Sequence, residues 1–117
     1  MEKTINIDGK DIKFKATAST PRVYRQAFGR DIYLDMTTLY DELSKGETLS
    51  VEVLNTFENI AFCMAMQAEG VKLQREEVEA KMEEWLDGFD TFSIYQIVPQ
   101  LMDLWRLNTE QTITPKK

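Results

Sequence analysis

Residues 51–68, VEVLNTFENIAFCMAMQA, decide the fold of this chain. Most of their apolar side chains recur at helical spacing on one face, in a stripe of Leu54, Phe57, Ile60, Ala61, Met64 and Ala68. Phe62 and Met66 lie on another side of the same helix, so it is apolar around much of its circumference. Such a helix is either central or has a second partner. Ser50 is placed to cap its start and Gly70 to end it.

An N-terminal β-hairpin is predicted for residues 1–15, because the apolar residues of TINIDGKDIKFK alternate with polar ones. We prefer a turn at Gly9 and Lys10, since it pairs apolar residues with each other, Ile7 with Ile12 and Ile5 with Phe14. A turn at Asp8 and Gly9 gives poorer pairs, Ile7 with Lys10 and Phe14 with Lys3. The apolar face of this ribbon must cover helices, because a two-stranded ribbon alone is marginal in water.

Four further helices are expected, over roughly residues 21–28, 31–45, 74–88 and 94–107. Thr20 is placed to cap the first, before Pro21, and glycines are placed to end the first two. In the second, Tyr33 and Tyr40 share a flank where their polar tips can lie at a wet boundary. The sequence therefore predicts a mainly α fold, a small helical domain of about five helices over residues 1–107. Residues 108–117, NTEQTITPKK, are expected to be a flexible tail.

Charge is divided unevenly along the 117 residues, whose net charge is −6. Residues 1–30 carry seven basic and three acidic side chains, and residues 31–117 carry seven and seventeen. A basic end and an acidic body suit a protein whose one end attracts the body of a neighbouring copy. The alternative is that both regions are solvated and the charges only keep the protein soluble.

Catalytic and metal-binding patterns are missing from the sequence. It has no histidine and a single cysteine, Cys63, and it contains neither a Walker-type phosphate loop nor a GxGxxG motif. Glu76, Glu79 and Glu83 share a helical face, but we favour a solvated surface there, since the neighbouring acids and Lys81 have ordinary ion-pair spacing. We expect no enzyme activity, no cofactor and no metal. No apolar run approaches the about 20 residues of a membrane span, and MEKTINIDGK lacks the apolar core of a signal peptide, so we expect a cytoplasmic protein without membrane contact.

The candidate binding residues fall in two places. The segment KFKATASTPRVYRQAFGRDI, residues 13–32, is basic and contains Arg22, Tyr24, Arg25 and Arg30, which suit contact with a partner or with a second copy. These groups also suit a nucleic-acid backbone, but an acidic body with a pI near 4.7 repels that polyanion, so we favour a protein partner over nucleic acid. Phe62 and Met66 are the apolar pair expected to face a partner, with the core as the alternative.

The block FKATASTPRVYRQAFGRDIYLDM, followed by FENIAFCMAMQAE, resembles the tail assembly chaperones of long-tailed bacteriophages and prophages. YRQAFGRDI, residues 24–32, is the most recognisable part, and the resemblance covers roughly residues 10–105. It implies a non-enzymatic protein of the host cytoplasm that binds and solubilises the tape measure protein, associates with itself into an oligomer or spiral, and is absent from the mature virion. The alternative is a structural head–tail joining protein, or another morphogenesis protein, that stays in the virion.

The resemblance also implies a longer form of the protein. Related chaperones are often extended by ribosomal slippage near the end of the gene, and the appended domain contacts the tail tube protein. Consecutive lysine codons can supply the slippery run, so Lys116 and Lys117 are candidates for the slip site. The alternative is that the two lysines are an ordinary soluble end. Residues from Asn108 onward would then serve as a linker.

Overall fold

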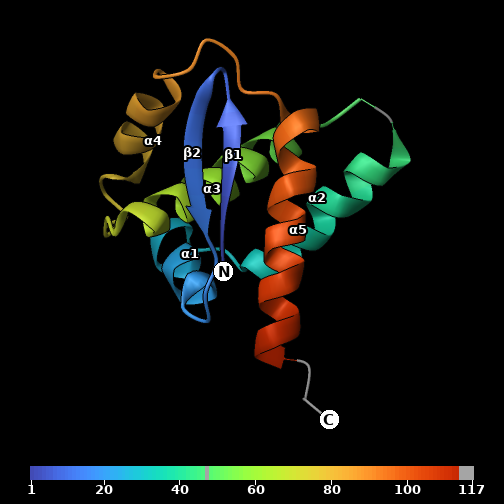
Figure 1. Ribbon diagram of the computed structural model, residues 1–117, viewed down its shortest axis with the longest axis horizontal. Coiled ribbons are helices and arrows are strands. Elements are labelled where there is room, and N and C mark those ends of the chain that lie inside the picture. Colours follow the sequence, from blue (N-terminus) through green and yellow to red (C-terminus); the bar gives the residue numbers. More distant parts are fainter. Residues whose placement is uncertain (47, 114–117) are drawn as a thin grey trace.

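The computed structural model describes the backbone of residues 1–46 and 48–113 and the side chains of residues 1–46 and 48–106. Within these ranges the chain forms a hairpin and then five helices, which confirms the predicted fold class (Figure 1). The elements are β1 (Glu2–Ile7), β2 (Lys10–Lys15), α1 (Thr20–Phe28), α2 (Ile32–Lys45), α3 (Val51–Glu69), α4 (Val78–Leu86) and α5 (Ile94–Ile113). None of the described helices is long and apolar enough to cross a membrane.

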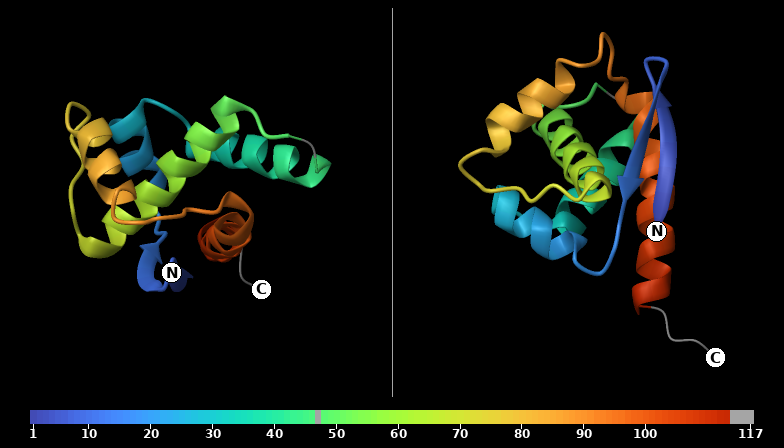
Figure 2. Two further views of the ribbon diagram at one scale, coloured as in Figure 1. Left: turned by 90° about the horizontal axis from the view of Figure 1, so that it is seen from above. Right: turned by 60° about the vertical axis from the view of Figure 1, so that its left-hand side comes forward.

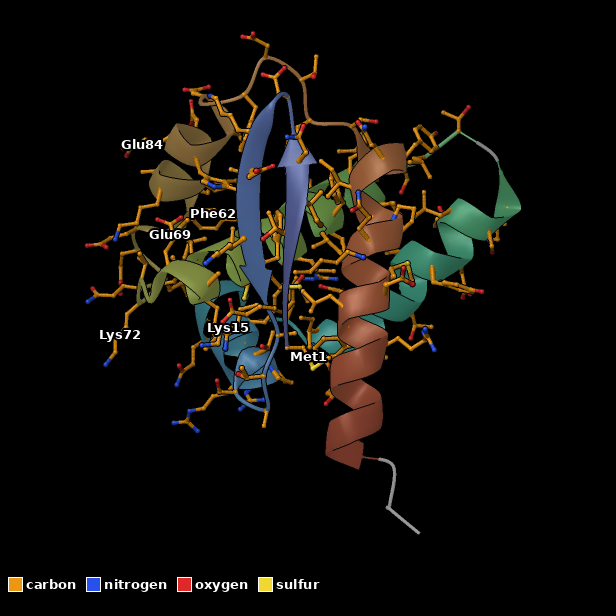
Figure 3. All side chains as sticks on the ribbon, viewed as in Figure 1. Met1, Lys15, Phe62, Glu69, Lys72 and Glu84 are labelled. Atoms are coloured by element: carbon orange, nitrogen blue, oxygen red, sulfur yellow. The ribbon has the colours of Figure 1, made fainter. Side chains whose placement is uncertain are left out.

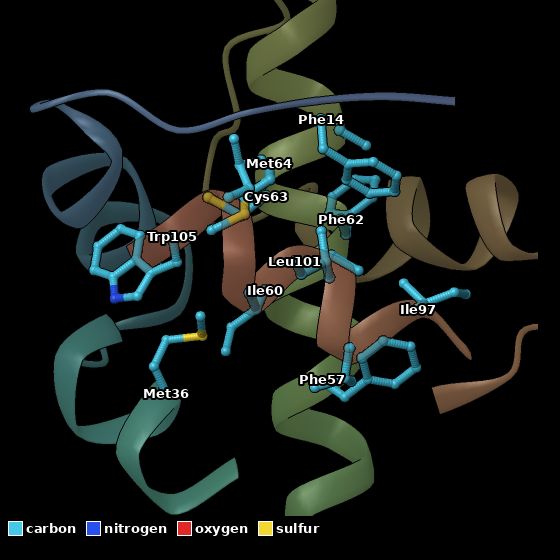
Figure 4. Close-up of a cluster of buried hydrophobic side chains, with 14 of the residues drawn as sticks. Phe14, Met36, Phe57, Ile60, Phe62, Cys63, Met64, Ile97, Leu101 and Trp105 are labelled. Carbon is cyan, nitrogen blue, oxygen red and sulfur yellow. The ribbon is translucent and has the colours of Figure 1, made fainter. Parts of the chain in front are cut away.

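Helix α3 is the centre of the fold, which is one of the two arrangements that its apolar circumference indicated. It packs against β2, α1, α2 and α5, and the side chains around it form the core (Figure 4). Burial raises the pKa of the Cys63 thiol to about 12, so this cysteine is an inert core residue. Leu54 departs from the prediction because it is 39% exposed; Val53 and Phe57 take the inward-facing positions in the first turns.

The hairpin lies with its apolar face on α3, but its register differs from the one we preferred. The turn is Asp8-Gly9, and Ile5 pairs with Ile12, Ile7 with Lys10 and Lys3 with Phe14. Both turn residues have positive φ, 55° and 79°, as the primed turn that matches the twist of a hairpin requires. Phe14 and the two isoleucines of β1 are still buried, because opposite residues share a face and the lysine stems lie at its margin.

Helix α1 begins differently from the prediction. Thr20 is its first residue rather than its cap, and its hydroxyl accepts from the Thr17 amide at 2.8 Å and donates to the Gln67 side chain at 2.7 Å. The Gln67 amide nitrogen also donates to the Thr17 hydroxyl at 2.7 Å. These bonds tie the segment between β2 and α1 to the last turn of α3. Gly29 ends α1 in the left-handed conformation, as predicted.

Helices α4 and α5 have other bounds than those predicted. Helix α4 is shorter than the predicted 74–88 and runs from Val78 to Leu86. The Arg75 guanidinium before it donates to the carbonyl groups of Arg25 and Gln26 near the end of α1. Helix α5 continues to Ile113, past the predicted start of the tail at residue 108. Residues 114–117, with the candidate slip site at Lys116 and Lys117, lie outside the described residues.

Candidate functional site

The six candidate binding residues do not form one surface. Arg22 and Arg25 are exposed on α1, as expected. Tyr24 and Phe62 are completely buried, at 0% exposure, and so are not available to a partner in the folded protein. Arg30 is committed to an ion pair within the chain, and Met66 is buried except for an edge that lines a groove. The structure thus divides the predicted set into surface, core and groove residues.

Tyr24 and Arg30 are held by Asp35, a buried carboxylate that the sequence reading missed. The Tyr24 hydroxyl donates to Asp35 Oδ2 at 2.6 Å, and the Arg30 guanidinium donates to both carboxylate oxygens at 2.8 Å. Burial alone would raise the pKa of Asp35, but these hydrogen bonds outweigh it and hold that pKa below its ordinary value. The pKa of Tyr24 is raised by burial and by the Asp35 charge. This cluster joins α1 to α2, which is a structural role.

Phe62 belongs to an aromatic cluster between α3, α4 and the hairpin, so its expected exposure is corrected. Its ring lies 5.7 Å from that of Trp85, which also contacts Phe14, Phe89 and Phe92. Apolar residues on opposite sides of α3 are buried because the hairpin, α4 and α5 cover different faces of it (Figure 2). The core alternative for Phe62 is therefore confirmed.

Met66 lines an open groove of about 540 Å³, which we call the hairpin groove. It lies between β2, the end of α3 and α4, and is lined by Lys10, Ile12, Met66, Glu69, Val71, Lys81, Glu84, Trp85, Gly88 and Phe89. The Lys10 ammonium closes one end, since it lies 5.5 Å from the centre of the Phe89 ring and donates to the Gly88 carbonyl. Glu69 and Glu84 border it beside the hairpin (Figure 3). The groove has an apolar floor and a rim of mixed charge.

A second groove, of about 350 Å³, lies between α2 and α5, and we call it the tyrosine groove. It is lined by Tyr40, Leu43, Ser44, Val98, Pro99, Met102 and Asp103. The two helices meet where the Tyr33 ring packs 5.3 Å from the Trp105 ring, and they diverge toward the end of α2 (Figure 1). The groove is therefore an open, largely apolar surface between two helices that separate toward the end of α2.

Exposed tyrosines extend the tyrosine groove on both helices. Tyr40 is 59% exposed, and Tyr95, which is 68% exposed, precedes Pro99 and Met102 at the spacing of one helical face. The sequence indicated part of this surface, since Tyr33 and Tyr40 were expected at a wet boundary. It did not indicate the facing residues of α5, because only the packing of α5 against α3 decides which face of that helix meets α2.

Acidic side chains on α4 and just before it border a third groove, which is lined by Glu58 of α3 together with Glu76, Glu79 and Glu83. Desolvation raises the pKa of Glu58. The predicted surface ion pair is present, with Lys81 Nζ 3.2 Å from a Glu77 carboxylate oxygen. Among the side chains that the structure describes, no group of three or more acids, cysteines or histidines is arranged to hold a metal ion.

Comparison with protein-family models, with curated proteins and with solved structures finds no match for this chain.

Proposed function

We propose that this protein is a tail assembly chaperone of a long-tailed bacteriophage or prophage, without enzymatic activity. In this role it binds and solubilises the tape measure protein in the host cytoplasm and is absent from the mature virion. The observation that carries the proposal is the tyrosine groove, an open apolar surface between two helices on a small acidic domain. The resemblance of residues 24–32 and of the central helix to such chaperones supports the same function.

The tyrosine groove suits an apolar helical ligand. An amphipathic helix binds a hydrophobic groove through side chains at the spacing of one helical face, and Tyr40, Pro99 and Met102 provide a matching surface. Tyrosine and methionine bind varied apolar segments well, because a tyrosine ring keeps its hydroxyl in water and a methionine side chain adapts its shape. A tape measure protein, whose long helices expose apolar faces before the tube encloses them, is a ligand of this kind.

Charge on the tyrosine groove favours a ligand with basic residues beside its apolar face. Asp103 is the charged residue in the lining. A carboxylate at the groove attracts a partner with basic side chains and disfavours an acidic one. Many copies of a domain with net charge −6 along a tape measure protein would also repel other such complexes and oppose aggregation.

The proposal includes two further contacts. Self-association would join the exposed arginines of α1 to the acidic body of the next copy, and a heterologous contact of this kind produces a spiral or filament when it does not close. A frameshifted longer form would connect the domain to the tail tube protein. Sequencing the overlapping reading frame after Lys117 tests that longer form.

The proposed function is tested by co-expression with the tape measure protein. Tyr40→Glu places a charge in the tyrosine groove and is expected to reduce co-purification and the soluble fraction of the tape measure protein by at least about tenfold, since one lost apolar anchor costs about 1.5–3 kcal/mol. Leu34→Glu is the matched control, because Leu34 is 67% exposed on another face of the same helix. Equal loss in both variants, or in neither, would contradict the assignment of the groove.

Purified virions provide a second test. A chaperone is present during assembly and missing from finished particles by mass spectrometry. Stoichiometric recovery from particles would instead favour the head–tail joining function.

A further inference from the structure

The outer edge of β2 is an unpaired sheet edge. In the observed register, residues 10, 12 and 14 of β2 exchange hydrogen bonds with β1, because the residues that flank a two-residue turn form a hydrogen-bonded pair. The N–H and C=O groups of Asp11, Lys13 and Lys15 therefore point away from β1. Within the described part of the chain, these backbone groups make no hydrogen bond. They form a template for one more strand.

The two edges of the hairpin have different surroundings. Helix α5 runs along β1 and covers that edge (Figure 1). The edge of β2 is open: Asp11 and Lys13 are exposed, and α4 lies behind the plane of the hairpin rather than level with it (Figure 2). An added strand thus has access to β2 and not to β1.

The hairpin groove lies where the inner face of such a strand would be. Ile12 and Lys10, which line it from β2, belong to the face of the hairpin that covers α3. A strand paired with β2 continues this face, so its alternate side chains would enter the groove above Met66 and Trp85. The groove is apolar at its floor, which suits valine, isoleucine or leucine at those positions.

Charge on the outer face of β2 defines the other side of the ligand. Lys13 and Lys15 point to that face, and within the described residues neither takes part in an ion pair. Glu2 lies opposite Lys15 in the register, whereas Thr4 lies opposite Lys13. The Asp11 carboxylate accepts from the Asn6 side-chain amide at 3.0 Å. A strand with acidic side chains on its outer face complements the lysines, and one with basic side chains does not.

We propose that the edge of β2 and the hairpin groove bind an extended segment of a partner protein by strand addition, with apolar side chains on one face of the segment and acidic side chains on the other. Backbone hydrogen bonds to Asp11, Lys13 and Lys15 provide affinity, and the groove and lysines select the sequence. This site is separate from the tyrosine groove, and it does not depend on the proposed chaperone function.

The test uses a blocked synthetic peptide of about eight residues, a usual strand length, with alternating valine and glutamate. Binding is followed by amide NMR and hydrogen exchange on the full chain at neutral pH. We expect exchange of the Asp11, Lys13 and Lys15 amides to slow by at least about tenfold at saturation, because these amides gain hydrogen bonds. The amides of Thr4 and Asn6, which point outward from β1, should keep their rates. A peptide of alternating valine and lysine should bind at least about tenfold more weakly.

Substitutions at Lys13, with a matched control at Thr4, test whether the peptide binds at the edge of β2. Lys13→Pro removes the central outward amide without removing a bond to β1, and it should abolish peptide binding; Thr4→Pro is the matched change on the covered edge and should leave binding intact. Lys13→Glu should reverse the preference, so that the valine–lysine peptide binds more tightly. Circular dichroism checks that each variant is folded. If Lys13→Pro is unfolded, the proposal is tested by the exchange rates of the wild-type amides and by the peptide preference of Lys13→Glu.

Protection of the β1 edge, equal binding of both peptides, unchanged binding to Lys13→Glu or no binding of either peptide would overturn the proposal. Loss of tape measure binding in Tyr40→Glu would have no effect on this result, so the two assignments fail separately.

Discussion

The buried carboxylate of Asp35 gives Tyr24 and Arg30 a structural role in the fold. The sequence placed Tyr24 and Arg30 on a basic surface, but both side chains donate hydrogen bonds to the carboxylate of Asp35, a side chain that is only 5% exposed. Burying a charge is unfavourable unless it is paired and hydrogen-bonded, and here two donors satisfy it. The segment that resembles the tail assembly chaperones therefore contains at least one contact within the chain that holds α1 on α2, besides any residues that contact a partner.

The acid sensitivity of the protein is predicted at this residue scale. Because the pKa of Asp35 is lower in the folded chain, its contribution to stability is present above the ordinary value of 3.8 and is lost as pH falls below it. Asp35→Asn should lower the free energy of unfolding by about 2 kcal/mol at neutral pH, since charge-assisted hydrogen bonds are lost. Urea unfolding at pH 7 and at about pH 3 should show the difference between the two proteins narrowing in acid. A difference that is independent of pH would contradict the role of the Asp35 charge.

The hairpin turn also differs from the prediction that the sequence favoured. Pairing apolar residues with each other favoured a turn at Gly9 and Lys10, yet backbone geometry places Asp8 and Gly9 in the left-handed region. The turn conformation is intrinsic to the backbone, whereas the cost of an Ile7–Lys10 pair is small because the lysine stem lies along the apolar face and its ammonium reaches Gly88 and Phe89. Turn chemistry therefore outweighs side-chain pairing here.

A matched pair of substitutions tests the turn. Asp8→Val should lower the free energy of unfolding by about 1–2 kcal/mol, because a β-branched residue is strained at positive φ and because the hydrogen bond that Asp8 Oδ2 accepts from the Asp90 amide is lost. Lys10→Val should change it by less than about 1 kcal/mol, because Lys10 is a strand residue with an exposed end. Thermal and urea unfolding measure the free energy of unfolding of both variants. The opposite order of effects would indicate a turn at Gly9 and Lys10 instead of the observed turn at Asp8 and Gly9.

At the scale of the whole molecule, the charge asymmetry predicts self-association that weakens with salt. Exposed charges are screened within a Debye length of about 8 Å at physiological ionic strength, so a contact between the arginines of α1 and an acidic body should dissociate as salt rises. Arg22→Glu with Arg25→Glu should reduce assembly measured by light scattering and change the stability by no more than about 0.5 kcal/mol.

Arg30→Glu is the control for this experiment, because Arg30 pairs with Asp35 and its reversal should destabilise the fold itself. A wild-type protein that stays monomeric at every concentration and salt level would exclude this assembly.

The fold could be predicted largely from local patterns. The period of two before residue 16, the helical period after it and the glycines that end α1, α2 and α3 specify the elements, because these patterns act over a few residues. The side chains of α3 indicated either a central position or a second binding partner, and the packing of β2, α1, α2 and α5 around it makes it central. The start of α4 was less predictable, because the segment before it contacts α1 through Arg75, and α1 is distant in the sequence.

The candidate sites could be predicted only in part. Local patterns were enough to predict a small helical domain with a hairpin, a divided charge and tyrosines on a flank of α2. They did not predict that Phe62 and Tyr24 are buried, that the tyrosine groove forms between α2 and α5, or that the edge of β2 stays open while α5 covers β1. Exposure and grooves are set by the packing of distant elements against one another, whereas period and capping are properties of neighbouring residues.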